Sequence, residues 1–338
     1  MAGLRKLLFP FSLIYQGVTS LRNGMYDRGL IDSTAYDLPV ICVGNLSVGG
    51  TGKSPMIEYL IRLLKDDFKV AVLSRGYKRS TKGFLEVTIS HTAAEVGDEP
   101  LQFKTKYPGT TIAVCADRRE GIDKLKKKAE VILLDDAFQH RKVKAGLNLL
   151  LTTFEQPFID DLILPAGDLR ESRIGAERAQ AIIITKIPEK AAYAAVQKLE
   201  FRLREFSGSP IYKTRISYED QIYSAMSAES LDYLKDKDFT LVTGIAKPEP
   251  LIKFLQEQGC RFELQRYPDH HEFTQSQLNQ LEKKQLVVTT EKDFMRLKGR
   301  LQKKALYYLP IKTEFLEREG HFESMILDFV HKYWDKIV

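Results

Sequence analysis

The sequence predicts an α/β fold in which a mostly parallel sheet lies between layers of helices. Short apolar runs alternate with polar stretches of helical length, and the runs are apolar on both of their faces. Strands of that kind are buried on both sides, which is typical of parallel sheets covered by helices. A glycine-rich loop between the first run and the helical stretch that follows it fits the same architecture.

Length and composition support a globular protein with two domains or one large domain. The chain has 338 residues, and its hydrophobic fraction of 43% and charged fraction of 28% exclude a collagen, a disordered chain and a disulfide scaffold. The net charge of +6 fits anionic ligands or an anionic membrane face and does not require nucleic acid. Cys42, Cys115 and Cys260 lie far apart, which argues against a disulfide framework and a zinc site, so a reducing cytosol is expected.

Residues 1–35 predict an amphipathic segment. Basic residues flank it, and no window reaches the ~18–20 apolar residues that a membrane-spanning helix needs. Because no small-residue cleavage site follows, a signal peptide is not expected. Two interpretations remain open from amphipathicity alone, namely binding at a membrane surface and packing on the protein's own core. One helical face would carry Leu4, Leu7, Leu8, Phe11, Ile14, Tyr15, Val18 and Leu21.

The rest of the chain divides into a larger part, residues 36–215, and a smaller C-terminal α/β part, residues 216–338. The strands expected in the larger part are 40–43, 70–73, 111–114, 131–134, 147–151 and 181–184. Helical patterns lie between several of them, as at 55–64 and 119–128. In the smaller part the alternation resumes with 239–242, 255–258 and 286–289.

The most informative stretch is VICVGNLSVGGTGKSP, residues 40–55. An apolar strand, a glycine-rich loop and a helix in this order are typical of a phosphate-binding loop, in which backbone N–H groups and the helix N-terminus face an anion. The GxxxxGK[ST] pattern has a serine here in place of its first glycine, and the alternative is a chance turn before a helix. The predicted loop residues are Ser47, Val48, Gly49, Gly50, Thr51, Gly52, Lys53 and Ser54. Lys53 would contact the β- and γ-phosphates, and the Ser54 hydroxyl would bind Mg²⁺.

A second strand, residues 131–134, leads into Asp135 and Asp136, as in a Walker B strand that binds magnesium. The predicted fold is therefore that of a P-loop NTPase. ATP is the expected nucleotide, because the guanine-reading NKxD pattern is missing and TKIP at 185–188 is a poor substitute. The loop alone does not separate a kinase from a switch or a partitioning ATPase, although Val48 stands where partitioning ATPases carry a signature lysine.

A kinase also needs groups that act on the acceptor hydroxyl and on the transferred phosphoryl group. Four polar clusters could supply them, and each could also be an ordinary helix cap, ion pair, loop or helix start. They are GDEP at 97–100, LPAGDLRE at 164–171, PDHHEF at 268–273 and TTEKD at 289–293.

Taken together, the motifs resemble those of the tetraacyldisaccharide 4′-kinases, the lipid A 4′-kinases of Gram-negative bacteria. This family also has a hydroxylated residue at the position of Ser47, and Ala137, Asp168 and Ser172 are mild departures from it. The motifs cover the chain in order from about residue 20 to 300. They are LRNGMYDRG at 21–29, VGNLSVGGTGKSP at 43–55, SRGYKR at 74–79, VGDEP at 96–100, DDAFQHR at 135–141, LPAGDLRES at 164–172, TGIAKPEP at 243–250, PDHHEF at 268–273 and TEKD at 290–293.

The resemblance implies ATP- and Mg²⁺-dependent phosphorylation of the 4′-hydroxyl on a tetraacylated glucosamine disaccharide 1-phosphate. It also implies two α/β domains and a peripheral position at the cytoplasmic face of the inner membrane, so it favours the membrane interpretation of residues 1–35. The expected partners are the lipid acceptor and the membrane surface, with no nucleic acid, and a monomer is expected. Two alternatives remain, a kinase of another amphiphile and an ATPase that acts as a nucleotide-gated switch.

Residue roles follow from the resemblance position by position. Asp98 would accept the proton of the sugar hydroxyl, and His270 would orient Asp98 and tune its pKa, with His271 as the other possibility. The resemblance further implies that Asp135 and Asp136 hold Mg²⁺. Arg170 would offset charge on the transferred phosphoryl group, and Glu171 would bind metal or orient Arg170.

Overall fold

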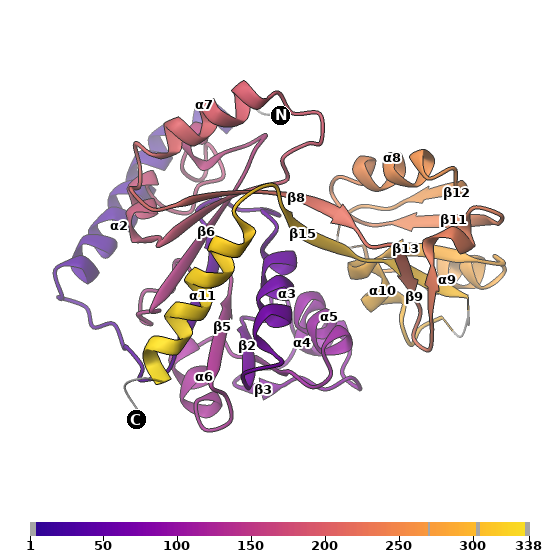
Figure 1. The fold of residues 1–338 in the computed structure, drawn as a ribbon, viewed down its shortest axis with the longest axis horizontal. Helices are drawn as coiled ribbons and strands as arrows, with labels where there is room; N and C mark the ends of the chain where they lie inside the picture. Colours follow the sequence, from indigo (N-terminus) through magenta and orange to yellow (C-terminus); the bar gives the residue numbers. More distant parts are fainter. Residues whose placement is uncertain (1–4, 270, 302–304, 335–338) are drawn as a thin grey trace.

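The computed structural model describes residues 5–269, 271–301 and 305–334, and it contains two sheets (Figure 1). The larger has nine strands in the order β15-β8-β7-β6-β1-β5-β2-β4-β3. Seven of them run parallel, from β8 to β4, and the two edge strands β3 and β15 are antiparallel to their neighbours. The strands are β1 (Val40–Asn45), β2 (Val70–Ser74), β3 (Leu85–Glu86), β4 (Thr111–Val114), β5 (Val131–Asp135), β6 (Leu147–Thr153), β7 (Ala181–Thr185), β8 (Ile211–Tyr218) and β15 (Ile311–Phe315).

Helices cover both faces of this sheet, as the sequence predicts. Buried side chains of α3, α5 and α11 pack on one face, and those of α6 and α7 pack on the other. The helices of this part are α2 (Phe9–Asp27), α3 (Lys53–Leu64), α4 (Ala93–Val96), α5 (Asp98–Lys106), α6 (Arg118–Leu125), α7 (Tyr193–Leu203) and α11 (Glu319–Trp334), with short 3-10 turns η1 (Lys6–Leu8), η2 (Phe158–Asp160) and η3 (Arg173–Arg178). The six predicted strands and the two predicted helices are confirmed, because side chains apolar on both faces can be buried only in a sheet covered on both sides.

The smaller sheet has the strand order β10-β9-β14-β13-β11-β12, and its core continues into that of the larger sheet through α10. Its elements are β9 (Gln221–Tyr223), β10 (Ala228–Ser230), η4 (Leu231–Leu234), β11 (Asp238–Thr243), α8 (Glu249–Glu257), β12 (Arg261–Arg266), α9 (Gln275–Glu282), β13 (Val287–Thr290), α10 (Glu291–Leu297) and β14 (Leu306–Leu309).

Two details differ from the sequence-based expectation. Residues 255–258 do not form a strand but include the end of α8, where Leu251 and Leu255 are buried at helical spacing. The predicted C-terminal part, 216–338, also does not stay with the smaller sheet. β15 pairs with β8 in the larger sheet, and α11 packs on that sheet. Edge pairing between segments about a hundred residues apart has no signature within either segment.

The helix α2 carries its apolar side chains outward. Phe11 is 62% exposed, Ile14 is 67% exposed, and only Ser12 and Tyr26 are buried in this helix. Of the two interpretations left open by the sequence, packing of this face on the protein's own core is therefore excluded for the described residues. No helix in the described ranges has both the length and the apolarity that crossing a bilayer requires.

Candidate active site

The phosphate loop lies between β1 and α3, at the carboxyl edge of the larger sheet. Gly49 and Gly52 adopt φ values of +114° and +89°, a region that favours glycine, and Gly52 immediately precedes the first residue of α3, Lys53. The Val48 N–H donates to the Asp168 carbonyl at 2.7 Å, and Ser47 forms a bridge with Leu169. The segment 164–171 therefore contacts the backbone of the phosphate loop and holds it in place.

The pKa values of two neighbouring carboxyls at the end of β5 are shifted in opposite directions. Asp135 is buried and accepts a hydrogen bond from the Ser74 hydroxyl at 3.0 Å. Burial, with the adjacent charge of Asp136, raises the pKa of Asp135 to about 6. Asp136 receives two hydrogen bonds from Arg170, at 2.9 and 3.2 Å, and lies 3.6 Å from the Lys53 ammonium. Burial opposes its ionisation, but these two cations outweigh burial and lower the pKa of Asp136.

The structure thus brings Lys53, Asp135, Asp136 and Arg170 together. Burial lowers the pKa of Lys53, and the charges of the two aspartates counteract that effect. A cationic pair converging at the N-terminus of α3 is an arrangement that binds phosphate oxygens.

Thr185, which ends β7, and Lys186, which follows it, also support the phosphate loop. Neither residue is among the site residues that the sequence predicts. The Thr185 hydroxyl donates to the Thr51 carbonyl at 2.8 Å, and the Lys186 ammonium donates to the Gly50 carbonyl at 2.6 Å. Lys186 has a φ of +56°, and burial lowers its pKa. The sequence signal for these two residues is TKIP at 185–188 after an apolar strand, a pattern that is also a poor match to the guanine-reading motif.

Glu171 is buried in a network of a different kind. Its carboxylate accepts hydrogen bonds from Asn23 of α2 at 2.6 Å, from Gln139 at 3.0 Å and from Arg178 at 2.9 Å. These contacts tie α2 to the segment 164–171. Its predicted metal role stays a prediction, and within the described ranges no three His, Cys, Asp or Glu side chains gather as a metal cluster. The oxygen donors of Ser54, Asp135 and Asp136 are nevertheless the kind that Mg²⁺ prefers.

Asp98 begins α5 and lies against α10 of the smaller sheet. Arg296 donates from Nε to an Asp98 carboxylate oxygen at 3.1 Å, and Lys292 contacts Glu99 at 2.7 Å. The charge of Glu99 contributes to the raised pKa of Asp135, after burial and Asp136, and that of Lys292 acts on Lys53. The charges of the GDEP motif and of α10 therefore influence the pKa values of two groups at the proposed phosphate site.

Of the two candidate histidines, His270 lies outside the described residues. His271 Nε2 is 2.9 Å from Gln277 Oε1, and its ring stacks on Tyr267 with centroids 4.7 Å apart. His271 is thus engaged in the turn that precedes α9.

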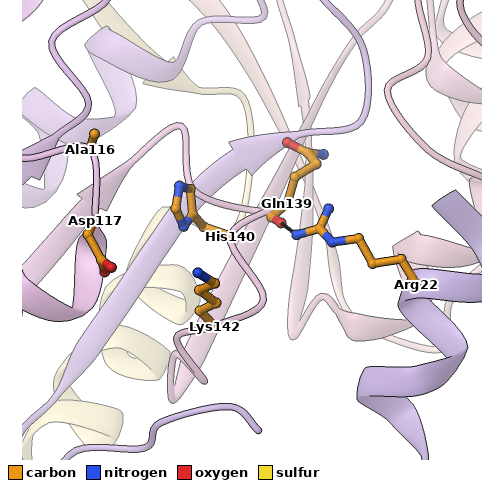
Figure 2. A pocket seen from close by; sticks show the side chains of 6 residues that line it. All are labelled: Arg22, Ala116, Asp117, Gln139, His140 and Lys142. Atoms are coloured by element: carbon orange, nitrogen blue, oxygen red, sulfur yellow. Dashed lines mark hydrogen bonds between the residues drawn. The ribbon is translucent and has the colours of Figure 1, made fainter. Parts of the chain in front are cut away.

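A cavity of about 280 Å³ opens between α2 and the loops that follow β4 and β5 (Figure 2). Figure 2 shows Arg22 on one side and Asp117, His140 and Lys142 on the other. Burial, with the charges of Arg118 and Arg75, lowers the pKa of His140 to about 4. The cavity lining is Arg22, Ala116, Asp117, Gln139, His140 and Lys142, so its fixed charge is mainly positive.

Comparison with known proteins identifies relatives over the whole length of the chain. The family described as tetraacyldisaccharide-1-P 4′-kinase matches residues 4–331. A tetraacyldisaccharide 4′-kinase of Flavobacterium psychrophilum is 47% identical over 98% of both chains, and one of Bacteroides thetaiotaomicron is 40% identical over 97% of this chain and 94% of its own. The crystal structure of "apo" form LpxK from Aquifex aeolicus in complex with ATP aligns with a TM-score of 0.80 at 33% identity, covering 97% of this chain and 99% of that one.

Proposed function

Because the chain belongs to the family of tetraacyldisaccharide-1-phosphate 4′-kinases, we propose that its phosphate loop holds ATP while Asp98 acts on the acceptor sugar. The protein is an ATP-dependent kinase of lipid A biosynthesis that phosphorylates the 4′-hydroxyl of a tetraacylated glucosamine disaccharide 1-phosphate. One observation supports the proposed site most directly, namely that Lys53 and Arg170 converge on Asp136 at the start of α3.

The residues from Ser47 to Ser54 would cradle the triphosphate through their backbone N–H groups. A nucleotide brings phosphate oxygens to which Lys53 and Arg170 can turn from Asp136, and both cations would then offset charge on the transferred group. Ser54, Asp135 and Asp136 would hold Mg²⁺, which when bound would neutralise part of the phosphate charge.

Asp98 would take the proton of the 4′-hydroxyl. The freed oxygen then bonds to the γ-phosphorus, and the bond from that phosphorus to its bridging oxygen breaks to release ADP. We assign His270 as the histidine that orients Asp98, because His271 is already engaged with Gln277 and Tyr267.

The cavity beside α2 would receive the 1-phosphate of the acceptor. Arg22 and Lys142 supply cations to this cavity. Arg22 belongs to α2, and the acyl chains would lie along the exposed apolar face of that helix. A phosphate monoester at one end of the disaccharide would then place the distal sugar at a fixed distance from the cavity.

The variant Arg22→Ala/Lys142→Ala should raise KM for the disaccharide 1-phosphate about 10–100-fold and leave kcat within about twofold, because charge-assisted hydrogen bonds to a phosphate are lost. Transfer from γ-labelled ATP measures this effect, with the label located on the distal sugar. An acceptor without the 1-phosphate should show no difference between the variant and the wild type. Lys144→Ala, at an exposed lysine two residues along, is the control. An equal penalty with both acceptors would contradict the assignment.

We also propose that α2 places the enzyme, as a monomer, at the cytoplasmic face of the inner membrane. The apolar side chains Phe11 and Ile14 lie outward on a helix flanked by arginines, as in helices that lie in a lipid interface.

Phe11→Ser/Ile14→Ser should weaken binding to vesicles that contain anionic lipid by about 10–100-fold, because each side chain loses about 1 kcal/mol or more of apolar transfer. Vesicle co-sedimentation measures the partition. The matched control is Met226→Ser, which changes a side chain that is 90% exposed in the turn between β9 and β10. Equal partitioning of both variants would exclude α2 as the contact.

A further inference from the structure

A chain of charged contacts links the smaller sheet to Asp98. Arg296 of α10 donates to one Asp98 carboxylate oxygen through Nε at 3.1 Å and also through Nη2. Both side chains are largely buried, with 10% of Arg296 and 14% of Asp98 exposed. The third nitrogen of the guanidinium, Nη1, donates to Asp293 at 3.1 Å. Arg296 therefore bridges the two aspartates.

Asp293 is itself fixed by the end of β11. It is fully buried and accepts hydrogen bonds from the Gly244 N–H at 2.8 Å and from the Thr290 hydroxyl at 2.7 Å. A Cβ atom on Gly244 would lie 2.8 Å from the Asp293 carboxylate, so a side chain there would displace it. The glycine of the TGIAKPEP motif and the aspartate of the TEKD motif thus set the position of the guanidinium.

We propose that, acting beside His270, Arg296 is a further positioning residue of Asp98 that holds the carboxylate oriented for the acceptor hydroxyl and so makes the smaller sheet part of the transfer step. This inference rests on the proposed role of Asp98 as the group that takes the hydroxyl proton.

Arg296 would act on the orientation of Asp98 and not on its strength as a base. A guanidinium beside a carboxylate favours the ionised form and so makes it a weaker base. In phosphoryl transfer with a loose transition state the nucleophile needs little activation, and catalysis depends on positioning. A forked cation that is fixed at both ends supplies positioning.

Other ion pairs cross the same junction but do not contact Asp98. They are Lys292 with Glu99 and Lys106 with Glu291. Among the residues that the structure describes, the charged groups around Asp98 include Arg296, Lys292 and Asp293 of α10, Asp269 after β12, and Glu99 on its own helix. Within the described part of the chain, Arg296 is the cation that donates hydrogen bonds to the Asp98 carboxylate.

Arg296→Gln should lower kcat about 10²-fold with KM for ATP changed less than about threefold, because the acceptor hydroxyl loses its alignment. Arg296→Lys should lower kcat about tenfold, a smaller loss than Arg296→Gln, because it keeps the charge and loses the forked donor geometry. Arg266→Gln, which breaks an exposed pair with Glu249 on the same sheet, is the control.

Asp98→Asn separates this inference from the function on which it rests. If that variant keeps wild-type transfer, the role of Asp98 itself is wrong. If Asp98→Asn is inactive while Arg296→Gln keeps the wild-type kcat, only the positioning role is overturned, and a lowered Tm with kcat unchanged has the same meaning. Should Arg296→Gln fail to fold, Arg296→Lys decides, because a wild-type kcat in that variant overturns the proposal.

Discussion

Lys53→Met is expected to lower kcat/KM about 10³-fold or more, with the fold intact. Lys53 is the first residue of α3, and its ammonium lies 3.6 Å from Asp136 at the position proposed for the phosphates. Methionine keeps most of the length and packing of the side chain but removes the charge that stabilises the transferring phosphoryl group, and losses of this order are typical of such groups.

The measurement is initial-rate transfer of the γ-phosphoryl group to the disaccharide acceptor, beside the Tm of each variant. Lys65→Met is the matched control, because Lys65 ends the same helix in an exposed pair with Asp66. It should keep wild-type kcat/KM. A Lys53→Met enzyme within tenfold of the wild type would mean that the triphosphate lies elsewhere.

Lys106→Met is expected to cost about 3–5 kcal/mol of folding free energy, because it leaves buried carboxyls without their cation. The Lys106 ammonium lies 2.5 Å from Glu58 of α3 and 2.6 Å from Glu291 of α10. Both carboxyls are buried, so this pairing joins the phosphate-loop helix, α5 and the smaller sheet in one charged cluster.

The folding free energy lost in Lys106→Met should be larger at higher pH. Burial, with the charge of Glu58, raises the pKa of Glu291. A carboxyl whose folded pKa is raised contributes stability below its unfolded pKa near 4.5, and that contribution is lost as the pH rises through the folded pKa. The free energy of unfolding of the wild type should therefore fall as the pH rises through the folded pKa of Glu291. Glu291→Gln should reduce this pH dependence.

Thermal unfolding at pH 5 and pH 8 tests both expectations. Lys106→Met should lower Tm by about 10 °C at pH 8 and by less at pH 5. Adding Glu291→Gln should restore part of the loss, because one buried charge is then removed. Lys124→Met, at a surface pair with Glu120, should leave Tm within about 2 °C. A Lys106→Met variant as stable as this control at both values would contradict the buried-charge argument.

Most of the larger sheet could be predicted from the sequence because its strands carry their own signature. A run such as that of β5 is apolar on both faces, and its burial follows from composition alone. The window 255–258 was too short to distinguish strand from helix, and only the spacing of Leu251 and Leu255 shows the helix. The return of β15 to β8 depends on contacts that neither segment encodes by itself.

The same distinction applies to the site. The phosphate loop and the paired aspartates are contiguous in sequence, so their chemistry could be predicted from spacing. Lys186 contacts the Gly50 carbonyl and Arg296 contacts Asp98 only because the fold brings distant segments together, and no local pattern marks either residue. The contacts of Glu171 with α2 are equally non-local, so the metal role implied by the motif did not anticipate them.

The segment 164–171 contacts α2 and the phosphate loop at the same time. The Ala166 N–H donates to Ser12 of α2 at 3.0 Å, while the Asp168 carbonyl accepts from the Val48 N–H. A bilayer that favours one placement of α2 would thereby favour one shape of the loop. Thermodynamic reciprocity then requires that bound ATP change the affinity of the enzyme for lipid by the same factor, so residence time on the bilayer would report the nucleotide state.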